Sequence, residues 1–339
     1  MPLWGLAKVG PNGPAFFSFL QGSAMLNAYS VKDNCLVPKG VQADADWLDG
    51  AIWIDLINPS VDEIKTAENF SGISLPNIKE TEELEASSHY EVYSTGFQIN
   101  CSFLQETEET FSNITVAFLC NDKCLISLCV QEISTIRLLQ KRWQKRPVSK
   151  RDPLSIIIAL LEIKVDETAD LLENAYLSIE KISHQIFGRN NTELEKTIDD
   201  LSSQDDLNGK MRLCLMDAQR DLNFILRRRH LTEENLVSVN DMLEDVKTLL
   251  THNTFHSERI DFLLNAALGF INIEQNKIIK IFSIAAVVLM PPTVIASIYG
   301  MNFHFMPELS WPWGYPLSLL LMVLAGISPY VYFKRKGWL

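Results

Sequence analysis

Two long stretches of the chain are apolar and contain no charged side chain: residues 281–299 (IFSIAAVVLMPPTVIASIY) and residues 316–333 (PLSLLLMVLAGISPYVYF). At about 1.5 Å per helical residue each stretch spans roughly 27–29 Å, close to the ~30 Å hydrocarbon core of a bilayer. A buried hairpin of a soluble protein is the alternative, but two uncharged runs of this length are unusual in soluble cores. The pattern therefore predicts two transmembrane helices.

The charges that flank these stretches predict their orientation. Lys277 and Lys280 precede the first stretch and residues 334–336 (KRK) follow the second, whereas residues 300–315 contain no Lys or Arg. Basic residues favour the cytoplasmic side of a membrane. Both termini are therefore expected in the cytoplasm and the connecting loop outside. Residues 1–14 show no signal-peptide pattern, which fits a large cytoplasmic N-terminal part.

Residues 1–150 mix strand-like and helix-like patterns. Helical periodicity occurs at 60–70, where Ser60 and Glu63 are spaced as a capping box, and again at 132–143. Runs rich in β-branched and aromatic residues predict strands at 51–56, 90–103, 114–120 and 123–130. The combination predicts an α/β domain.

From residue 151 onward the pattern is helical. A helix is expected over 154–188, because Pro153 stands just before its start and Gly188 at its end. The stretch 227–235 (RRRHLTEEN) is the best candidate for a turn between helices. The helix after it, about 236–299, would be roughly 95 Å long and would need partners from its own fold or from sister subunits.

The predicted fold is therefore a cytoplasmic α/β domain, a long-helix stalk and two C-terminal transmembrane helices. We expect the α/β domain at 1–150, the helical stalk at 151–276 and the transmembrane hairpin at 277–339. Within the hairpin, the first span is expected at 281–299, the outer loop at 300–315 and the second span at 316–333, followed by a basic tail.

Charge and motif content narrow the function classes. The formal net charge is −12, which argues against nucleic acid as a partner. The basic stretch 141–153 is predicted to be a helix end followed by a linker rather than a nucleic-acid-binding patch. The six cysteines form no CxxC pair, so buried reduced thiols are expected rather than a disulfide framework or a metal site. The chain has no phosphate-binding loop, no GxSxG and no metal triad, so it is not expected to be an enzyme.

One face of the long helix is polar yet uncharged. Its members recur at intervals of three and four: Asn265, Leu268, Asn272, Asn276, Ile279, Ser283, Ala286, Met290, Thr293 and Ser297. The face could be a helix–helix contact, since Ser and Thr pack readily in membranes, or it could line a pore. A pore for a hydrated cation needs amide and hydroxyl oxygens that bind the ion's waters, without carboxylates that trap it. Bulky apolar rings at Ile279, Phe282 and Met290 could close such a pore by dewetting.

The C-terminal part resembles a known family. The segments INIEQNKIIKIFS, PPTVIASIYGMNFHFMPELSWPWGYP and PYVYFKRKGWL are similar, nearly residue by residue, to the CorA family of magnesium channels over about 265–339. Upstream, WIDLINPSVDEI resembles the start of the family's α/β domain more weakly. The resemblance implies a funnel-shaped homopentamer in the bacterial inner membrane, with the first transmembrane helices around the pore.

The resemblance also implies roles for individual residues. Gly300, Met301 and Asn302 match the family's outer selectivity ring, in which Asn302 would bind hydrated Mg²⁺. Asp241 matches a carboxylate at which cytoplasmic Mg²⁺ closes the pore. The pore-lining set would be Asn265, Leu268, Asn272, Asn276, Ile279, Ser283, Met290 and Thr293, with the hydrophobic gate at Ile279, Phe282 and Met290.

The sequence departs from the family pattern at several positions. The second sensing carboxylate is expected near Ser87 and Ser88, so Glu83 or Glu85 would have to substitute. Asn265 stands where some relatives carry Asp, and His304 where many carry Glu. A separate pair, His252 and His256, has the spacing of a two-ligand metal site, but interface packing is the preferred interpretation because no third ligand is in view.

These patterns and the family resemblance together predict a Mg²⁺ influx channel. Mg²⁺ would be both transported and regulatory, Co²⁺ and Ni²⁺ would also pass, and the membrane potential would supply the energy. An ion-coupled transporter of another divalent metal, such as Zn²⁺, is the alternative.

Overall fold

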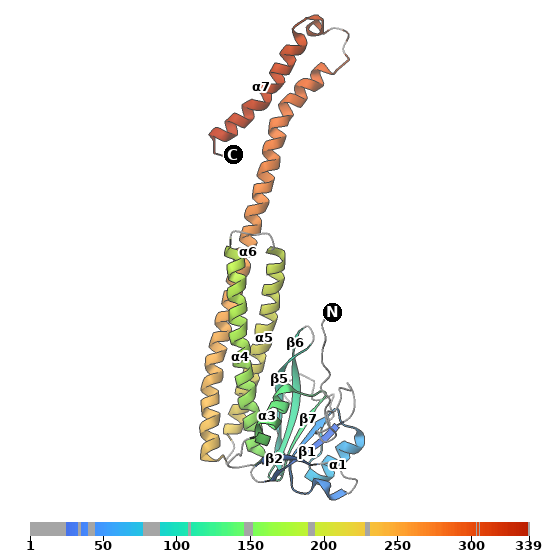
Figure 1. Cartoon of the computed structure of the whole chain (residues 1–339), viewed down its shortest axis with the longest axis vertical. Coiled ribbons are helices and arrows are strands. Elements are labelled where there is room, and N and C mark those ends of the chain that lie inside the picture. Colours follow the sequence, from blue (N-terminus) through green and yellow to red (C-terminus); the bar gives the residue numbers. More distant parts are fainter. Residues whose placement is uncertain are drawn as a thin grey trace, which may run out of the picture. The chain divides into compact units, whose positions relative to one another are not determined.

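The computed structural model describes residues 25–32, 35–39, 45–76, 89–107, 110–145, 152–188, 194–227, 231–302, 304 and 306–337. The chain divides into two compact units. The first comprises Met1–Glu180 and Ser202–Arg259, and the second comprises Lys181–Leu201 and Ile260–Leu339. Figure 1 labels their helices and strands.

A seven-stranded sheet forms the base of the first unit, with the strand order β2-β1-β3-β7-β6-β5-β4. All neighbouring strands are antiparallel except β3 and β7, which are parallel. The strands are β1 (Met25–Lys32), β2 (Cys35–Lys39), β3 (Ala51–Ile57), β4 (Tyr90–Val92), β5 (Gly96–Glu106), β6 (Phe111–Asn121) and β7 (Leu125–Cys129).

The predicted strands are confirmed, with two differences. The stretch predicted as one strand at 90–103 is split between β4 and β5, because the chain turns back between Tyr93 and Gly96, whose backbone N–H and carbonyl bond at 2.9 Å. Strands β1 and β2 were not predicted. The first mixes polar and apolar residues without strict alternation, and the second has only five residues and contains Pro38.

The helix α1 (Val61–Ser71) begins at the predicted capping box. The Glu63 backbone N–H donates to Ser60 Oγ at 3.3 Å, and the Ser60 backbone N–H donates to Glu63 Oε2 at 2.7 Å. The helix ends at Gly72, whose φ of 71° lies in the left-handed region that favours glycine. The single-turn η1 (Ala45–Leu48) precedes β3.

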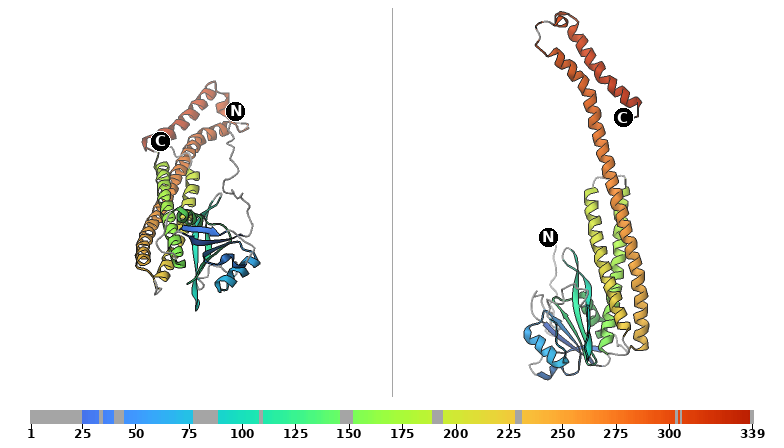
Figure 2. Two further views of the ribbon diagram at one scale, coloured as in Figure 1. Left: turned by 60° about the horizontal axis from the view of Figure 1, so that its bottom comes forward. Right: turned by 180° about the vertical axis from the view of Figure 1, so that it is seen from behind.

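Both faces of the sheet are covered, because successive strand side chains point to opposite sides. Ile54, Leu56 and Ile126 pack toward α1, whereas Trp53 and Leu125 pack in the larger core with the remaining helices of this unit. Figures 1 and 2 show α1 on one side of the sheet and α3 on the other. The other helices are the short α3 (Ser134–Lys145) and the long α4 (Pro153–Phe187), α5 (Leu194–Leu226) and α6 (Glu233–Tyr299).

The predicted helices are confirmed to within a few residues at their ends. The helix expected over 154–188 is α4, and the long helix expected from about residue 236 begins at Glu233. Pro291 and Pro292 lie inside α6, which continues past them. The described cysteine side chains are free and buried, as predicted: Cys101, Cys120, Cys124, Cys129 and Cys214.

The second unit contains the end of α6, the short η2 (Pro307–Ser310) and α7 (Gly314–Arg335). Both predicted spans lie in these helices, which are long and apolar enough to cross a membrane. In the most apolar windows, 0% of the α6 residues and 6% of the α7 residues are buried within the chain. Exposing so large an apolar surface to water is energetically unfavourable, so lipid or other protein must cover it.

A buried carboxyl makes the stability of the first unit pH-dependent. Asp55 is fully buried; Ser127 Oγ donates to it at 2.6 Å and itself accepts from Trp53 Nε1 at 2.9 Å. Burial raises the pKa of Asp55 to about 6, opposed by the Ser127 hydrogen bond. The folded state therefore binds the Asp55 proton more tightly than the unfolded state does. The stability that this proton contributes is fully present below about pH 4 and is lost as the pH rises through about 6.

Replacing Asp55 by Asn should remove this dependence. Relative to the wild type, Asp55→Asn should gain about 3 kcal/mol of unfolding free energy between about pH 3 and pH 7, since a pKa difference of about two units corresponds to that energy. Urea unfolding of the purified protein at several pH values measures it. The exposed Asp122→Asn is the control and should show no such gain. Parallel pH profiles for the wild type and Asp55→Asn would contradict the prediction.

Candidate functional site

The predicted polar face of α6 is exposed along its whole length in the chain. Ten residues make up this stripe, and each of them is solvent-exposed: Asn265, Leu268, Asn272, Asn276, Ile279, Ser283, Ala286, Met290, Thr293 and Ser297. Phe282, the other predicted gate residue, is 71% exposed. The chain itself therefore leaves this face open to another molecule.

The opposite face of α6 packs on α7. Its half-buried members are Ile284, Val288, Pro291, Pro292, Ile295 and Tyr299. On a helical wheel of 100° per residue their mean direction lies about 170° from that of the stripe residues from Ser283 to Ser297. The facing half-buried residues of α7 include Met322, Gly326 and Pro329. A Cβ on Gly326 would lie 3.3 Å from Pro292 Cγ, so this glycine allows the two helices to approach closely.

The stripe offers oxygen atoms without formal charge. Thr293 Oγ1 donates to the Leu289 carbonyl at 2.7 Å, and Asn265 Nδ2 donates to the Asp261 carbonyl at 2.9 Å. In both side chains a donor hydrogen is bonded to a backbone carbonyl of the same helix. The hydroxyl oxygen of Thr293 and the amide oxygen of Asn265 therefore remain available as acceptors. An uncharged acceptor can hold the waters of a hydrated cation without binding the cation itself.

The tripeptide Gly300-Met301-Asn302 directly follows the C-terminal end of α6. The Gly300 N–H donates to the Ala296 carbonyl at 2.9 Å, and the Met301 N–H donates to the Ile298 carbonyl at 3.3 Å. A Cβ on Gly300 would lie 3.1 Å from the Ala296 oxygen, so a side chain there would disturb this turn. A helix C-terminus carries partial negative charge, and no basic residue occupies the last turn of α6. Met301 and Asn302 are exposed there, which makes this end attractive to a cation.

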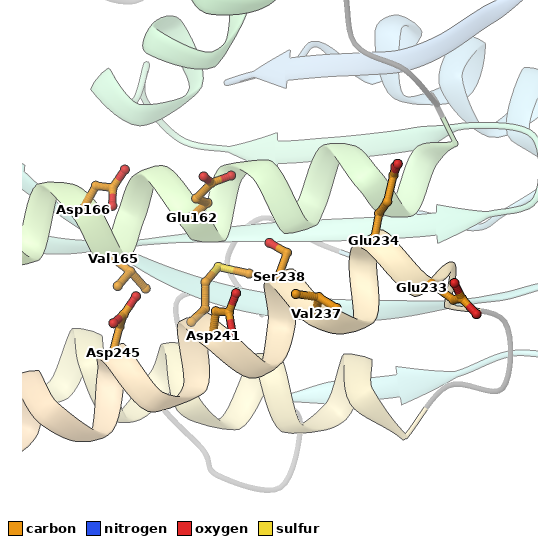
Figure 3. A pocket seen from close by; sticks show the side chains of 10 residues that line it. Glu162, Val165, Asp166, Glu233, Glu234, Val237, Ser238, Asp241 and Asp245 are labelled. Atoms are coloured by element: carbon orange, nitrogen blue, oxygen red, sulfur yellow. The ribbon is translucent and has the colours of Figure 1, made fainter.

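Asp241 lies in an acidic pocket of about 600 Å³ formed by α4 and the start of α6 (Figure 3). We call this the acidic pocket; its carboxylates are Glu162, Asp166, Glu233, Glu234, Asp241 and Asp245. Burial raises the pKa of Asp166, the nearby acids Asp170 and Asp245 raise it further, and Arg142 opposes them. The crowding of like charges means that a bound cation would relieve repulsion in this pocket.

Sequence reasoning identified Asp241 but none of the other acids in the pocket. The spacing of Asp241 and Asp245, four apart on one helix, was an available signal. The contribution of α4 was not, because Glu162 and Asp166 meet Asp241 only in the folded chain. The expected partner residues 83, 85, 87 and 88 lie outside the described part of the chain.

The pair His252 and His256 does not form a metal site with any third ligand among the described residues. The buried His256 ring lies 5.8 Å from the Tyr176 ring, centroid to centroid, while His252 is exposed. Burial lowers the pKa of His256, and the nearby His252 lowers it further. A packing role for His256 thus fits the structure.

The α/β unit, the long helix and the pair of exposed apolar helices define a membrane protein with an α/β domain and two candidate membrane spans. The family model described as CorA-like Mg²⁺ transporter protein matches residues 49–335. The chain belongs to this family, and it is not an enzyme.

Curated relatives of similar length support the assignment. The magnesium transport protein CorA of Pectobacterium atrosepticum is 41% identical over 317 residues, which cover 93% of this chain and 100% of the relative. The CorA proteins of Salmonella typhimurium and Escherichia coli (strain K12) are each 40% identical over 317 residues, with the same coverage of both chains.

Solved structures share the fold. The complete CorA magnesium transporter from Methanocaldococcus jannaschii superposes with a TM-score of 0.74 at 19% identity, covering 95% of this chain and 100% of that one. The full-length CmaX protein gives 0.68 at 13% identity, covering 94% and 100%. These matches confirm the predicted combination of an α/β domain, a long helix and two C-terminal apolar helices.

Proposed function

We propose that copies of this chain assemble into a pore through which Mg²⁺ enters the cell down the membrane potential. The observation that carries the proposal is the uncharged polar stripe of α6, which is exposed and lies opposite the face that packs on α7. A polar face cannot remain in contact with lipid without cost. Identical stripes from several copies, brought together around an axis, would enclose a water-filled path.

The choice of Mg²⁺ rests on the chemistry of the stripe and on the relatives. Mg²⁺ releases its octahedral water shell reluctantly, so a conduit for the hydrated ion needs acceptors for water protons. Asn265, Asn272 and Asn276 supply amide oxygens, and no acid lies on the stripe. The relatives that are about 40% identical are named magnesium transport proteins. Co²⁺ and Ni²⁺, which are also divalent, would share the path.

The outer end of the path would be the ring of Gly300, Met301 and Asn302. The negative end of α6 and the exposed Asn302 amide would hold the hydrated ion before it enters. Toward the cytoplasm, Met290 and Ile279 face the same side as the asparagines, with Phe282 beside them. Rings of these apolar side chains would empty a narrow pore of water and so close it.

Closure would respond to Mg²⁺ in the cytoplasm. The acidic pocket around Asp241 would bind the regulatory ion, and carboxylates of a neighbouring subunit would complete the site. Because six carboxylates already share this pocket, a divalent cation would gain favourable Coulomb energy there. Mg²⁺ would thus hold the subunits together when the cell has enough of it.

The assembly would be a homopentamer in the inner membrane of a bacterium, with both termini in the cytoplasm. We place the cytoplasmic α/β domain at 1–150, the stalk at 151–276 and the hairpin at 277–339, with its spans at 281–299 and 316–333. Lys277 and Lys280 before α6 leaves the cytoplasm, and Lys334 to Lys336 after the second span, support this orientation.

A passive channel needs no other energy source. At about −100 mV a divalent cation entering the cell gains roughly 4.6 kcal/mol, twice the 2.3 kcal/mol of a unit charge. An ion-coupled transporter of Zn²⁺ is not favoured, because the relatives at 40–41% identity are magnesium transport proteins.

Cysteine substitution tests the proposed path. Ser283→Cys and Ser297→Cys, on the stripe, should make Mg²⁺ flux sensitive to a charged thiol reagent, with at least ~10-fold inhibition, because the reagent would place a positive charge in the pore. Val288→Cys and Ile295→Cys, on the face toward α7, are the matched controls and should stay insensitive. The five cysteine side chains that the structure describes are buried, and the wild type is the control for any reaction of native thiols. Inhibition of the control variants alone would reverse the assignment of faces.

A further inference from the structure

A histidine and two aspartates converge at one point between the sheet and α5. Asp217 and Asp221 lie one turn apart on α5, and His89 stands directly before β4. His89 Nε2 lies 3.2 Å from Asp217 Oδ1 and 2.9 Å from Asp221 Oδ1. We call these three residues the His–Asp cluster.

The spacing of these donor atoms fits a metal ion. One ligand atom from each residue lies within 4.8 Å of the other two. Metal–nitrogen and metal–oxygen bonds of about 2.0–2.2 Å place neighbouring ligand atoms roughly 3.0–3.5 Å apart in octahedral or tetrahedral sites. The separation of 3.2 Å from His89 Nε2 to Asp217 Oδ1 lies in this range and that of 2.9 Å to Asp221 Oδ1 is just below it, so a small cation would bind after a small outward shift of the ligands.

The cluster also holds an acceptor that the protein satisfies only weakly. Asp221 is fully buried, and no described N–H or O–H donor makes a hydrogen bond to its Oδ2. Lys164 Nζ forms a long ion pair of 3.8 Å with this oxygen, and the buried Cys101 thiol, a weak donor, bonds to the Asp221 carboxylate. A closer cation would satisfy this buried oxygen more fully.

Asp217 is already held in the orientation that a ligand needs. The Ser102 backbone N–H donates to Asp217 Oδ2 at 2.7 Å, and Lys164 Nζ donates to the same oxygen at 2.8 Å. The other oxygen, Oδ1, is the one that faces His89. Outer partners of this kind fix ligand orientation in metal sites.

Lys164 is the cation that the protein itself places against the two carboxylates. Its buried ammonium lies 2.8 Å from Asp217 Oδ2 and 3.8 Å from Asp221 Oδ2. One lysine therefore faces two carboxylates, whose Oδ1 atoms both lie close to His89 Nε2.

We propose that His89, Asp217 and Asp221 bind a divalent transition-metal cation of the Zn²⁺, Co²⁺ and Ni²⁺ class, at a site separate from the acidic pocket and from α6. The imidazole nitrogen selects this class, because Mg²⁺ prefers oxygen ligands whereas Zn²⁺, Co²⁺ and Ni²⁺ accept nitrogen. The bound ion would join the segment before β4 to α5 and so stabilise the contact between the sheet and the helix.

Co²⁺ titration of the full-length protein in detergent tests the proposal. The protein is first freed of metal and then kept in a large excess of Mg²⁺, which occupies sites made only of oxygen. Added Co²⁺ should give a saturable visible d–d absorption and raise the melting temperature. His89→Gln should weaken this binding by at least about 10-fold. The control His252→Gln, which removes an exposed histidine elsewhere, should bind Co²⁺ like the wild type.

Each result bears on the proposal directly. Asp221→Asn is a second ligand variant and should behave as His89→Gln does; the melting temperature of each variant in Mg²⁺ alone shows whether it is folded. A wild type with no saturable Co²⁺ signal in excess Mg²⁺ would show that the cluster is only a network of ion pairs. An undiminished signal in folded His89→Gln would place the metal elsewhere. Either result would overturn the proposal, whatever the outcome of transport measurements.

Discussion

Replacing Asn302 by alanine should lower Mg²⁺ flux by at least ~100-fold while leaving the protein assembled. In the proposed pentamer one substitution removes five amide groups from the mouth of the pore. Each amide that binds a water of the ion contributes about 1 kcal/mol, so the loss of several exceeds the 2.8 kcal/mol that correspond to a factor of about 100. Flux into liposomes and the oligomer size on gel filtration are the measurements.

Asn223→Ala provides the matched control for this prediction. Asn223 is an exposed asparagine on α5, and its side chain donates to the Gln219 carbonyl one turn earlier. Its replacement removes the same group from a place outside the proposed pore, so flux should not change. If Asn302→Ala conducts as well as Asn223→Ala, the selectivity ring is not where we place it, even if the chain conducts Mg²⁺.

Neutralising two carboxylates of the acidic pocket should free the pore from inhibition by cytoplasmic Mg²⁺. The double variant Asp241→Asn/Asp245→Asn removes two of the six negative charges that would attract the regulatory ion. We expect the Mg²⁺ concentration for half-inhibition to rise by at least ~10-fold, since weakening the site by only about 1.4 kcal/mol has this effect. Flux measured at a series of internal Mg²⁺ concentrations gives this value.

A charge-matched variant separates a local effect from a general one. The double variant Glu106→Gln/Asp122→Asn removes two exposed acids outside the pocket. Glu106 is the last residue of β5, and Asp122 lies in the turn between β6 and β7. It changes the net charge by the same amount and should leave half-inhibition unchanged. Equal shifts in both double variants would indicate a general electrostatic effect on the cytoplasmic part. No shift in either would mean that the ion is sensed elsewhere.

The transmembrane part was the most predictable from sequence. Uncharged runs of span length and a polar period of three and four are local patterns, and α6 and α7 cover both predicted spans. The face of α6 that contacts α7 was not predicted. In the sequence, Ile284, Val288 and Ile295 do not differ from lipid-facing residues. Only the structure shows the contact, in which Gly326 lies against Val288 and Pro292.

The sites in the cytoplasmic part were less predictable, because they join distant segments. Asp241 was found through a family resemblance, but its α4 neighbours Glu162 and Asp166 carry no motif. The His–Asp cluster brings His89 to within 2.9 Å of Asp221, which is 132 positions away. A lone histidine beside a short edge strand gives no local signal of this contact, which depends on how α5 packs on the sheet.

Mg²⁺ uptake into liposomes under an imposed potential tests the central claim most directly. With an inside-negative potential, and without ATP or a proton gradient, the wild type should accumulate Mg²⁺ toward an inside-to-outside ratio of about 2000 at −100 mV, the factor that 4.6 kcal/mol supports. Uptake should fall as the potential is reduced. Uptake that does not depend on the membrane potential, or that requires a proton gradient, would contradict a passive channel.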